Sequence, residues 1–473
     1  MLIEPFIFKN LLHTVLGRHV VQDRPPPAGT GKIVLFEQIA SLSRRRQLIA
    51  RQTEGSRRRL RTNRLIQNAV ALMISSVGSA ILGVAFWGIA AHLATPRAVG
   101  RISAEITAMI LLATLAQLSF GTIFERFLPV AGIHTRSFII RAYVMCVTCA
   151  FVATSIYAFS GLANSYLPTP LVWRGLFVIS VVLWTIFALQ DSVLIGLRAA
   201  RWVPLENILF GAMKLALLPI FISVSPNQGI FLAWASPLIL TLIAVNWYVF
   251  TKRIPEHVVV DAPMEELPRS KELIVLAGAQ YATLLYSTIT PTIVTLIVIQ
   301  RLGAISNAHY FIPGLITGSL SVFLLSVYKS FVVEAASEPH KLRHHTNMAI
   351  GTMSAVLVPS VLIGVIFAPL ILRLVGPTYA THDTIALLRM LMLSLPMSAV
   401  SIFYSAFAWL DRRVWWLAVR DVVSVAVFFS VLLTLLSRHG ILAIGIASLI
   451  TAALQTVFFL PISIRRYRLT SNS

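Results

Sequence analysis

The chain has 473 residues, of which 57% are hydrophobic and only 12% are charged, and its mean hydropathy is +0.81. A soluble globular protein carries roughly twice that charged fraction, so the composition excludes a soluble fold. The formal net charge of +21 does not indicate nucleic-acid binding, because the basic residues cluster between apolar runs, as the positive-inside rule describes.

Residues 1–67 differ from the rest of the chain. They are rich in arginine, contain the proline run Pro25–Pro27, and end in an arginine cluster that begins at Arg57. This composition predicts a cytoplasmic tail that fixes the orientation of the first helix. As an alternative, residues 33–51 would form an amphipathic helix on an anionic membrane surface.

Apolar runs of about 20 residues recur from Asn68 almost to the C-terminus, and each is long enough to cross the hydrocarbon of a bilayer as a helix. The sequence therefore predicts an all-α polytopic membrane protein. Cys146 and Cys149 lie inside one such run, which favours helix packing over redox or metal chemistry. About 12 spans are predicted, over residues 68–92, 102–124, 142–162, 172–196, 203–224, 229–250, 273–300, 305–333, 347–372, 384–409, 415–436 and 440–463.

A polar connection divides the spans six and six. Residues 251–272 carry both signs of charge and three prolines, which is typical of a linker. The predicted organisation is therefore a tail at 1–67, a first six-helix bundle at 68–250, the linker at 251–272, a second six-helix bundle at 273–464 and a short tail at 465–473. Basic residues alternate between loops, so both termini are predicted to be cytoplasmic. Two like bundles with a cleft between them are the arrangement of an alternating-access transporter.

The loops on the outer side are short, with no room for an external catalytic domain. The sequence contains no Walker A loop, no H-E-x-x-H motif and no nucleophile elbow. We therefore expect no enzymatic activity, no catalytic residue, no cofactor and no metal site.

Lys214 is the basic residue that the topology assigns to neither membrane face. It lies about 16 Å from the cytoplasmic end of its span, at 1.5 Å per residue, which is too deep for its ammonium group to reach water easily. One interpretation is a cation that attracts an anionic substrate group, most plausibly phosphate. The other is a lysine neutralised by a carboxylate on a neighbouring helix.

Two acidic residues lie in or near spans. Asp191 is a turn or more from the cytoplasmic end of its span, where it would pair with Lys214 or Arg201, or bind a coupling proton or sodium ion. Glu105 lies close in sequence to Arg97 and Arg101, and a local ion pair is expected there.

Three arginines are further candidates for substrate contact. Arg126 ends the second predicted span and would meet a diphosphate at the cytoplasmic entrance, or simply anchor the helix at the interface. Arg389 lies one to two turns from the outer surface, and Arg420 lies beside Asp421 near the cytoplasmic end of span 11.

Three stretches are similar to bacterial polysaccharide-biosynthesis flippases of the O-antigen type, which belong to the multidrug/oligosaccharidyl-lipid/polysaccharide exporter superfamily. They are Q-L-S-F-G-T-I-F-E-R-F-L-P ending at Pro129, G-L-R-A-A-R-W ending at Trp202 with the lysine-bearing helix after it, and A-P-L-I-L-R-L-V-G-P-T-Y-A ending at Ala380 with L-L-R-M-L soon after. The likeness covers about residues 65 to 465 and implies a MATE-like fold.

The resemblance implies a function as well as a fold. Such a protein flips an undecaprenyl-diphosphate-linked oligosaccharide from the inner to the outer leaflet of the bacterial plasma membrane. Its partners would be the polyprenyl-diphosphate-linked glycan, the lipid bilayer, and glycosyltransferases or a polymerase of the same pathway. Two alternatives stay open: a cation-coupled multidrug antiporter of the same fold, and a non-transporting membrane component of a glycan synthase complex.

Overall fold

The computed structural model describes residues 75, 77–256, 270–337, 339–411 and 414–469. The N-terminal tail at 1–67, most of the predicted linker and the last four residues lie outside this range. All the described residues belong to one compact unit. All regular elements in the described ranges are helices.

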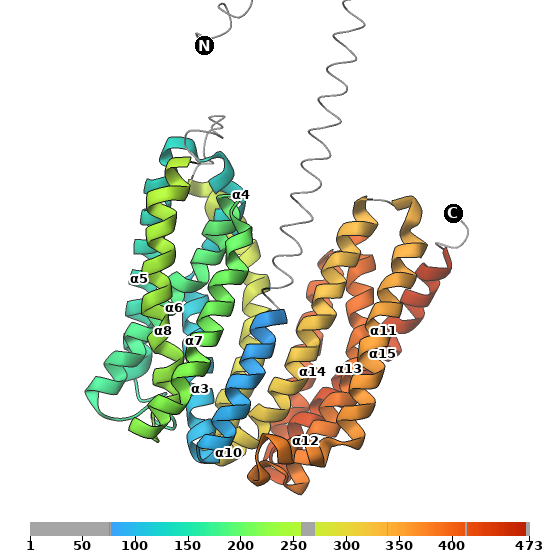
Figure 1. The fold of residues 1–473 in the computed structure, drawn as a ribbon. Helices are drawn as coiled ribbons and strands as arrows, with labels where there is room; N and C mark the ends of the chain where they lie inside the picture. The colour runs from blue at the N-terminus through green and yellow to red at the C-terminus, as the bar shows by residue number, and fades with distance from the viewer. Residues whose placement is uncertain (1–74, 76, 257–269, 338, 412–413, 470–473) are drawn as a thin grey trace, which may run out of the picture. The chain divides into compact units, whose positions relative to one another are not determined.

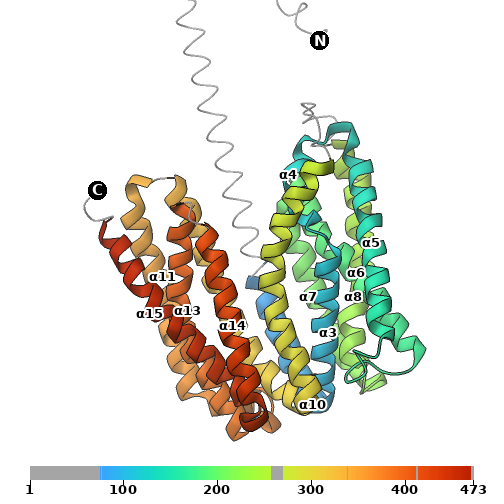
Figure 2. The ribbon, with the colours of Figure 1, turned by 180° about the vertical axis from the view of Figure 1, so that it is seen from behind.

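Six helices and a shorter segment make up the first part of the unit. In Figures 1 and 2, α3, α5, α6, α7 and α8 lie together, with α4 at one end of the group. The bounds are Val77–Leu93 for the first apolar helix, Pro96–Ala116 (α3), Phe120–Phe127 (α4), Thr135–Phe159 (α5), Leu171–Gly196 (α6), Val203–Val224 (α7) and Gly229–Tyr248 (α8).

The second part contains α11, α13, α14 and α15, which lie together in both views, and the short helix α12. Helix α10 packs against both α3 and α13 and thereby connects the two parts. The bounds are Ser270–Ser337 (α10), Leu342–Ile366 (α11), Ala368–Val375 (α12), His382–Leu410 (α13), Val414–His439 (α14) and Leu442–Leu469 (α15).

Ten helices in the described residues are long and apolar enough to cross a membrane. One of them, Thr290–Ala335, covers parts of two predicted spans, and the first predicted span appears as the shorter apolar helix Val77–Leu93. Each of the predicted spans thus coincides with helical structure. The prediction of an all-α, multi-span membrane protein is confirmed.

Helix α10 consists of two arms that meet at Gly303, where φ is 85° and ψ is 177°. Val294 and Tyr310 line the same cavity, although 16 residues of straight helix would separate them by about 24 Å. The chain therefore folds back at Gly303. A positive φ of this kind is accessible to glycine at no steric cost.

The predicted span 102–124 is not one helix. Helix α3 begins at Pro96, with Thr95 accepting a capping hydrogen bond from the Ala98 backbone at 3.3 Å. It ends at Ala116, and α4 starts only after Leu118 and Ser119, whose φ angles are 48° and 62°. Two consecutive residues in the left-handed region cannot continue a helix. The span 347–372 is likewise divided, between α11 and α12.

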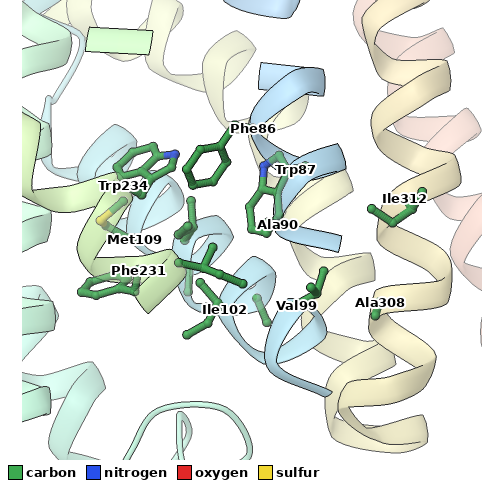
Figure 3. Packing of buried hydrophobic residues seen from close by; sticks show 14 of the residues in the cluster. Phe86, Trp87, Ala90, Val99, Ile102, Met109, Phe231, Trp234, Ala308 and Ile312 are labelled. Carbon is green, nitrogen blue, oxygen red and sulfur yellow. The ribbon is translucent and has the colours of Figure 1, made fainter. Parts of the chain in front are cut away.

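The largest buried apolar cluster joins the two parts. It contains residues of α3 and α8 together with Phe86, Trp87 and residues of α10 and α13. Figure 3 shows Phe86 and Trp87 on the first apolar helix, with Ala308 and Ile312 on α10. The rings of Trp87 and Phe311 meet edge to face, with centroids 4.6 Å apart.

The backbones of α3 and α10 approach closely at Gly100 of α3. A Cβ placed on this residue would lie 1.8 Å from the Ala304 carbonyl oxygen and 2.9 Å from the Ala308 backbone nitrogen. Asn307 donates a hydrogen bond to the Gly100 carbonyl at 2.7 Å and contacts the Ser103 hydroxyl at 3.2 Å. The start of α3 is therefore fixed to the start of the second arm of α10.

Candidate functional site

Lys214 lies among three aromatic rings. Its ammonium nitrogen is 5.3 Å from the centroid of Phe86, 5.2 Å from that of Phe210 and 5.8 Å from that of Trp234. The rings come from the first apolar helix, from α7 itself and from α8. We call Phe86, Phe210 and Trp234 the aromatic cage.

Local sequence explains how the cage forms. Phe210 precedes Lys214 by four residues, which places both side chains on one face of α7. Gly211 allows the first apolar helix to approach closely, because a Cβ there would lie 2.6 Å from Leu82 Cδ1. Figure 3 shows Phe86 and Trp234 side by side. Trp234 also packs on Trp184, with ring centroids 4.5 Å apart.

Lys214 makes no hydrogen bond and no ion pair with any residue in the described ranges. A cation over aromatic faces gains roughly 0.5–2 kcal/mol, more when it is shielded from water. This compensates part of the cost of placing an ammonium group in the membrane but supplies no counter-charge. The carboxylate partner that one interpretation of the sequence required is absent from the described residues. The cation retains its capacity to bind an anion.

Asp191 has a different partner from those expected. Both of its carboxylate oxygens accept a hydrogen bond from the Asn207 amide at 3.1 Å, and no pair with Lys214 or Arg201 is formed within the described residues. The turn between α6 and α7 directs Asn207, one residue beyond Glu206, toward α6. The Asn207 amide is thus the hydrogen-bond partner of the Asp191 carboxylate, for which the sequence predicted a cation.

Glu206 is a carboxylate whose burial the sequence did not reveal. Its side chain is 4% exposed, and neither carboxylate oxygen has a hydrogen-bond partner within the described part of the chain. It lies in the first turn of α7, where the helix dipole favours negative charge. An unpaired buried carboxylate of this kind is expected to exchange a proton or a cation.

Glu105 does not form the local ion pair that was expected. It is 1% exposed and one of its oxygens has no partner, while no ion pair with Arg97 or Arg101 occurs in the described residues. Arg101 instead donates to the Asn227 carbonyl at 2.5 Å. One amino group of the Arg101 guanidinium thus contacts the loop between α7 and α8, and Arg101 remains close enough to Glu105 for their charges to attract each other.

The remaining arginines occupy different settings. Arg126 is exposed on α4 and lies 5.4 Å from the Phe127 ring centroid. Arg389 donates to the Val365 carbonyl at 3.0 Å. Arg420 donates to Asp421 at 2.5 Å, to the Ser401 carbonyl at 3.1 Å, and to the Ser405 hydroxyl. No contact joins any two of these arginines, or any of them to Lys214, in the described residues.

The partners of Arg420 predict that it stabilises the second group of helices. Arg420→Gln should lower the free energy of unfolding by about 2 kcal/mol, since hydrogen bonds to charged groups contribute roughly 1.5–3 kcal/mol. Arg126→Gln, which removes the same charge from an exposed arginine, should change it by less than about 0.5 kcal/mol. Thermal unfolding of the purified variants in detergent measures the difference. Equal melting temperatures would contradict this role.

Comparison of the sequence with protein-family models and with curated proteins finds no match. Comparison of the structure with solved structures finds several similar chains. An outward-facing MATE-family multidrug resistance transporter of the MOP superfamily aligns over 87% of this chain and 96% of its own, with a TM-score of 0.57 and 15% identity. The fold is the MATE fold. An inward-facing structure of such a transporter covers 87% and 99%, with a TM-score of 0.58 and 14% identity.

A third similar structure is a MOP superfamily transporter from Pyrococcus furiosus. The polarity of its binding pocket is described as reversed, which suggests a different function for that protein. It covers 87% of this chain and 96% of its own, with a TM-score of 0.56 and 15% identity. At such identities the likeness concerns the MATE fold alone. The MATE-like architecture expected from the sequence is confirmed, and the chain is a multi-pass membrane protein.

Proposed function

We propose that the protein is a non-enzymatic flippase that moves an undecaprenyl-diphosphate-linked oligosaccharide from the inner to the outer leaflet of the bacterial plasma membrane by alternating access. A diphosphate and a hydrated glycan cannot cross hydrocarbon unaided. The transporter therefore has to offer a cation to the head group and polar groups to the sugars, while the prenyl tail stays in lipid.

The observation that carries the proposal is the environment of Lys214. Its ammonium group is surrounded by the aromatic cage and has no carboxylate partner in the described residues. A drug antiporter that binds cationic compounds needs negative charge or bare aromatic faces at this place. A lysine that occupies the aromatic faces itself repels such compounds and attracts an anion. We propose that this anion is the diphosphate.

A cavity in the second group of helices supports the sugar part of the proposal. It has a volume of about 400 Å³, lies between α10, α13, α14 and α15, and has no charged residue in its lining. Hydroxyl side chains from all four helices line it, among them Thr317, Ser398, Ser424 and Ser448. Serine and threonine hydroxyls both donate and accept hydrogen bonds, as sugar hydroxyls do. A neutral, hydroxyl-rich lining suits a glycan better than an apolar cation.

One observation favours the cation-coupled antiporter as a second candidate. Glu105 and Glu206 are buried carboxylates that form no ion pair in the described residues. Such groups are suited to taking up a proton or a sodium ion. They would serve equally well to drive a flippase, so the substrate has to be tested directly.

Reconstitution in vesicles separates the two functions. We expect purified protein to move a fluorescent polyprenyl-diphosphate-linked oligosaccharide between leaflets faster than protein-free vesicles do, as measured by protection of the label from a membrane-impermeant quencher. A matched polyprenyl-linked neutral glycan without the diphosphate should not be moved. Ethidium uptake driven by a proton or sodium gradient, without movement of the diphosphate lipid, would instead establish the antiporter.

A further inference from the structure

A cavity lies between helices α13, α14 and α15 in the second group of helices. The cavity has a volume of about 1210 Å³ and is lined by α13, α14 and α15. It contains neither Lys214 nor any residue of the aromatic cage. We call it the lateral cavity.

The walls of the lateral cavity are apolar, and the residues that form them recur at helical spacing. Val419, Val423 and Val427 follow one another at intervals of four on α14, and Leu454, Phe458 and Ile462 do so on α15. Spacing of this kind places each set on one face of its helix. Val423 is 55% exposed and Phe458 is 67% exposed, so the described residues leave these apolar faces uncovered. In a membrane an acyl chain can cover them.

One end of the lateral cavity is basic. Arg420, Arg465 and Arg466 line it, against a single acidic residue, Asp411. Asp411 pairs with Arg466 at 2.7 Å, and Arg420 is held by Asp421. Arg465 is exposed and has no hydrogen bond or ion pair with any residue of the described ranges. A guanidinium at this place is free to bind a phosphate.

Polar atoms without partners also line the lateral cavity. The hydroxyls of Thr451 and Ser463 and the Nε of Arg466 are buried and have no hydrogen-bond partner in the part of the chain described. Buried polar groups in proteins are nearly always hydrogen-bonded. Thr451 also lines the hydroxyl-rich cavity of about 400 Å³, whereas Ser463 and Arg466 line only the lateral cavity of the two.

The length of the lateral cavity matches one leaflet. Its lining runs from Trp416 to Val427 on α14, which is about 16 Å of helix. Half of a bilayer's hydrocarbon thickness is about 15 Å. An acyl chain of one leaflet therefore fits along the apolar faces with its head group at the arginines. A polyprenyl chain is several times longer and would extend far beyond the cavity.

We propose that the lateral cavity is a binding site for an anionic phospholipid, with an acyl chain along the valine and phenylalanine faces and the phosphate at Arg465. The proposal does not depend on which solute the protein transports. Arg465 supplies the charge that selects an anionic head group. Val423 lies where the acyl chain passes.

Native mass spectrometry of the purified full-length protein tests the proposal, with phosphatidylglycerol and phosphatidylcholine of identical chains as probes. The wild type should bind phosphatidylglycerol more tightly. Val423→Trp, which fills the cavity, should lose most of this binding, whereas Val422→Trp, whose side chain is exposed outside the cavity lining, should not. Arg465→Gln should weaken phosphatidylglycerol binding about fivefold, as one basic residue contributes about 1 kcal/mol at an anionic membrane. Arg343→Gln, an exposed arginine outside the cavity, is the charge-matched control.

Three outcomes would overturn the proposal. The first is equal binding of the two lipids by the wild type. The second is an Arg465→Gln effect no larger than that of Arg343→Gln. The third is displacement of phosphatidylglycerol by a polyprenyl diphosphate, which would assign the cavity to the transported lipid. Inorganic phosphate should not compete, since it has no chain to fill the apolar part; competition would indicate a free-phosphate site.

Discussion

Lys214→Ala is expected to reduce translocation of the diphosphate lipid by about thirtyfold or more. Removing one partner of a buried charge pair costs roughly 2–5 kcal/mol, and one factor of ten in rate corresponds to about 1.4 kcal/mol. Lys214→Arg keeps both the charge and the attraction to the aromatic rings, so it should retain a substantial part of the activity. Initial rates in vesicles, normalised to the amount of folded protein, provide the measurement.

Stability distinguishes substrate binding from a structural role for Lys214. Because its ammonium group has no ion pair in the described residues, alanine should leave the melting temperature unchanged or raise it. Lys252→Ala is the matched control, since Lys252 also lies over an aromatic ring, 5.9 Å from the centroid of Trp247, but is exposed. That variant should transport normally. Full transport by Lys214→Ala would show that Lys214 does not bind the substrate. A loss of folded protein as large as the loss of transport would show the same.

Gly100→Ala is expected to give the largest loss of stability. Its Cβ would meet the Ala304 carbonyl oxygen at 1.8 Å, and this oxygen belongs to backbone, so no rotamer change can relieve the clash. The start of α3 must then move away from α10, and the hydrogen bond from Asn307 to the Gly100 carbonyl is lost with it. Overpacking of this kind costs about 3 kcal/mol. Thermal unfolding in detergent should show a clear decrease in melting temperature.

Gly88→Ala provides the control for Gly100→Ala. Gly88 lies in the first apolar helix, and a Cβ there would meet nothing within 4 Å. Alanine has a higher helix propensity than glycine by about 1 kcal/mol, so this variant should be as stable as the wild type or slightly more stable. If both variants unfolded at the same temperature as the wild type, the close contact between α3 and α10 would not exist in the protein.

The helices could be predicted from the sequence because hydrophobic length determines them almost alone. The breaks inside two of the predicted spans could not be predicted in this way. Residues 102–124 carry one charged residue, Glu105, and no proline, and nothing local signals that Leu118 and Ser119 adopt left-handed backbone angles. Neither residue type favours this conformation. The packing of α4 against α6 provides a tertiary reason for it.

Lys214 could be singled out from the sequence because a lysine inside an apolar run is costly in lipid. Of the aromatic cage, only Phe210 could be predicted from the sequence, because it precedes Lys214 by four residues on the same helix. Phe86 and Trp234 come from other helices, and their approach depends on helix rotation and on the small residue at Gly211. The partner of Asp191 was missed for the same reason. The turn before α7 sets the rotation of that helix and so decides which of its side chains faces α6.

In the proposed alternating-access cycle, the contact between Gly100 and Ala304 would be the point about which α3 rotates. Gly100 lies near the start of α3, and Ala116 at its other end is about 24 Å away at 1.5 Å per residue. A rotation of the first group of helices about this point moves the far end of α3 by about 0.4 Å per degree of rotation, while Gly100 stays in place. A rocking of about 15°, similar in size to known subunit rotations, would displace the far end by about 6 Å. In this proposed cycle, the small volume of one glycine would let the start of α3 stay against α10 while the other end of α3 moves.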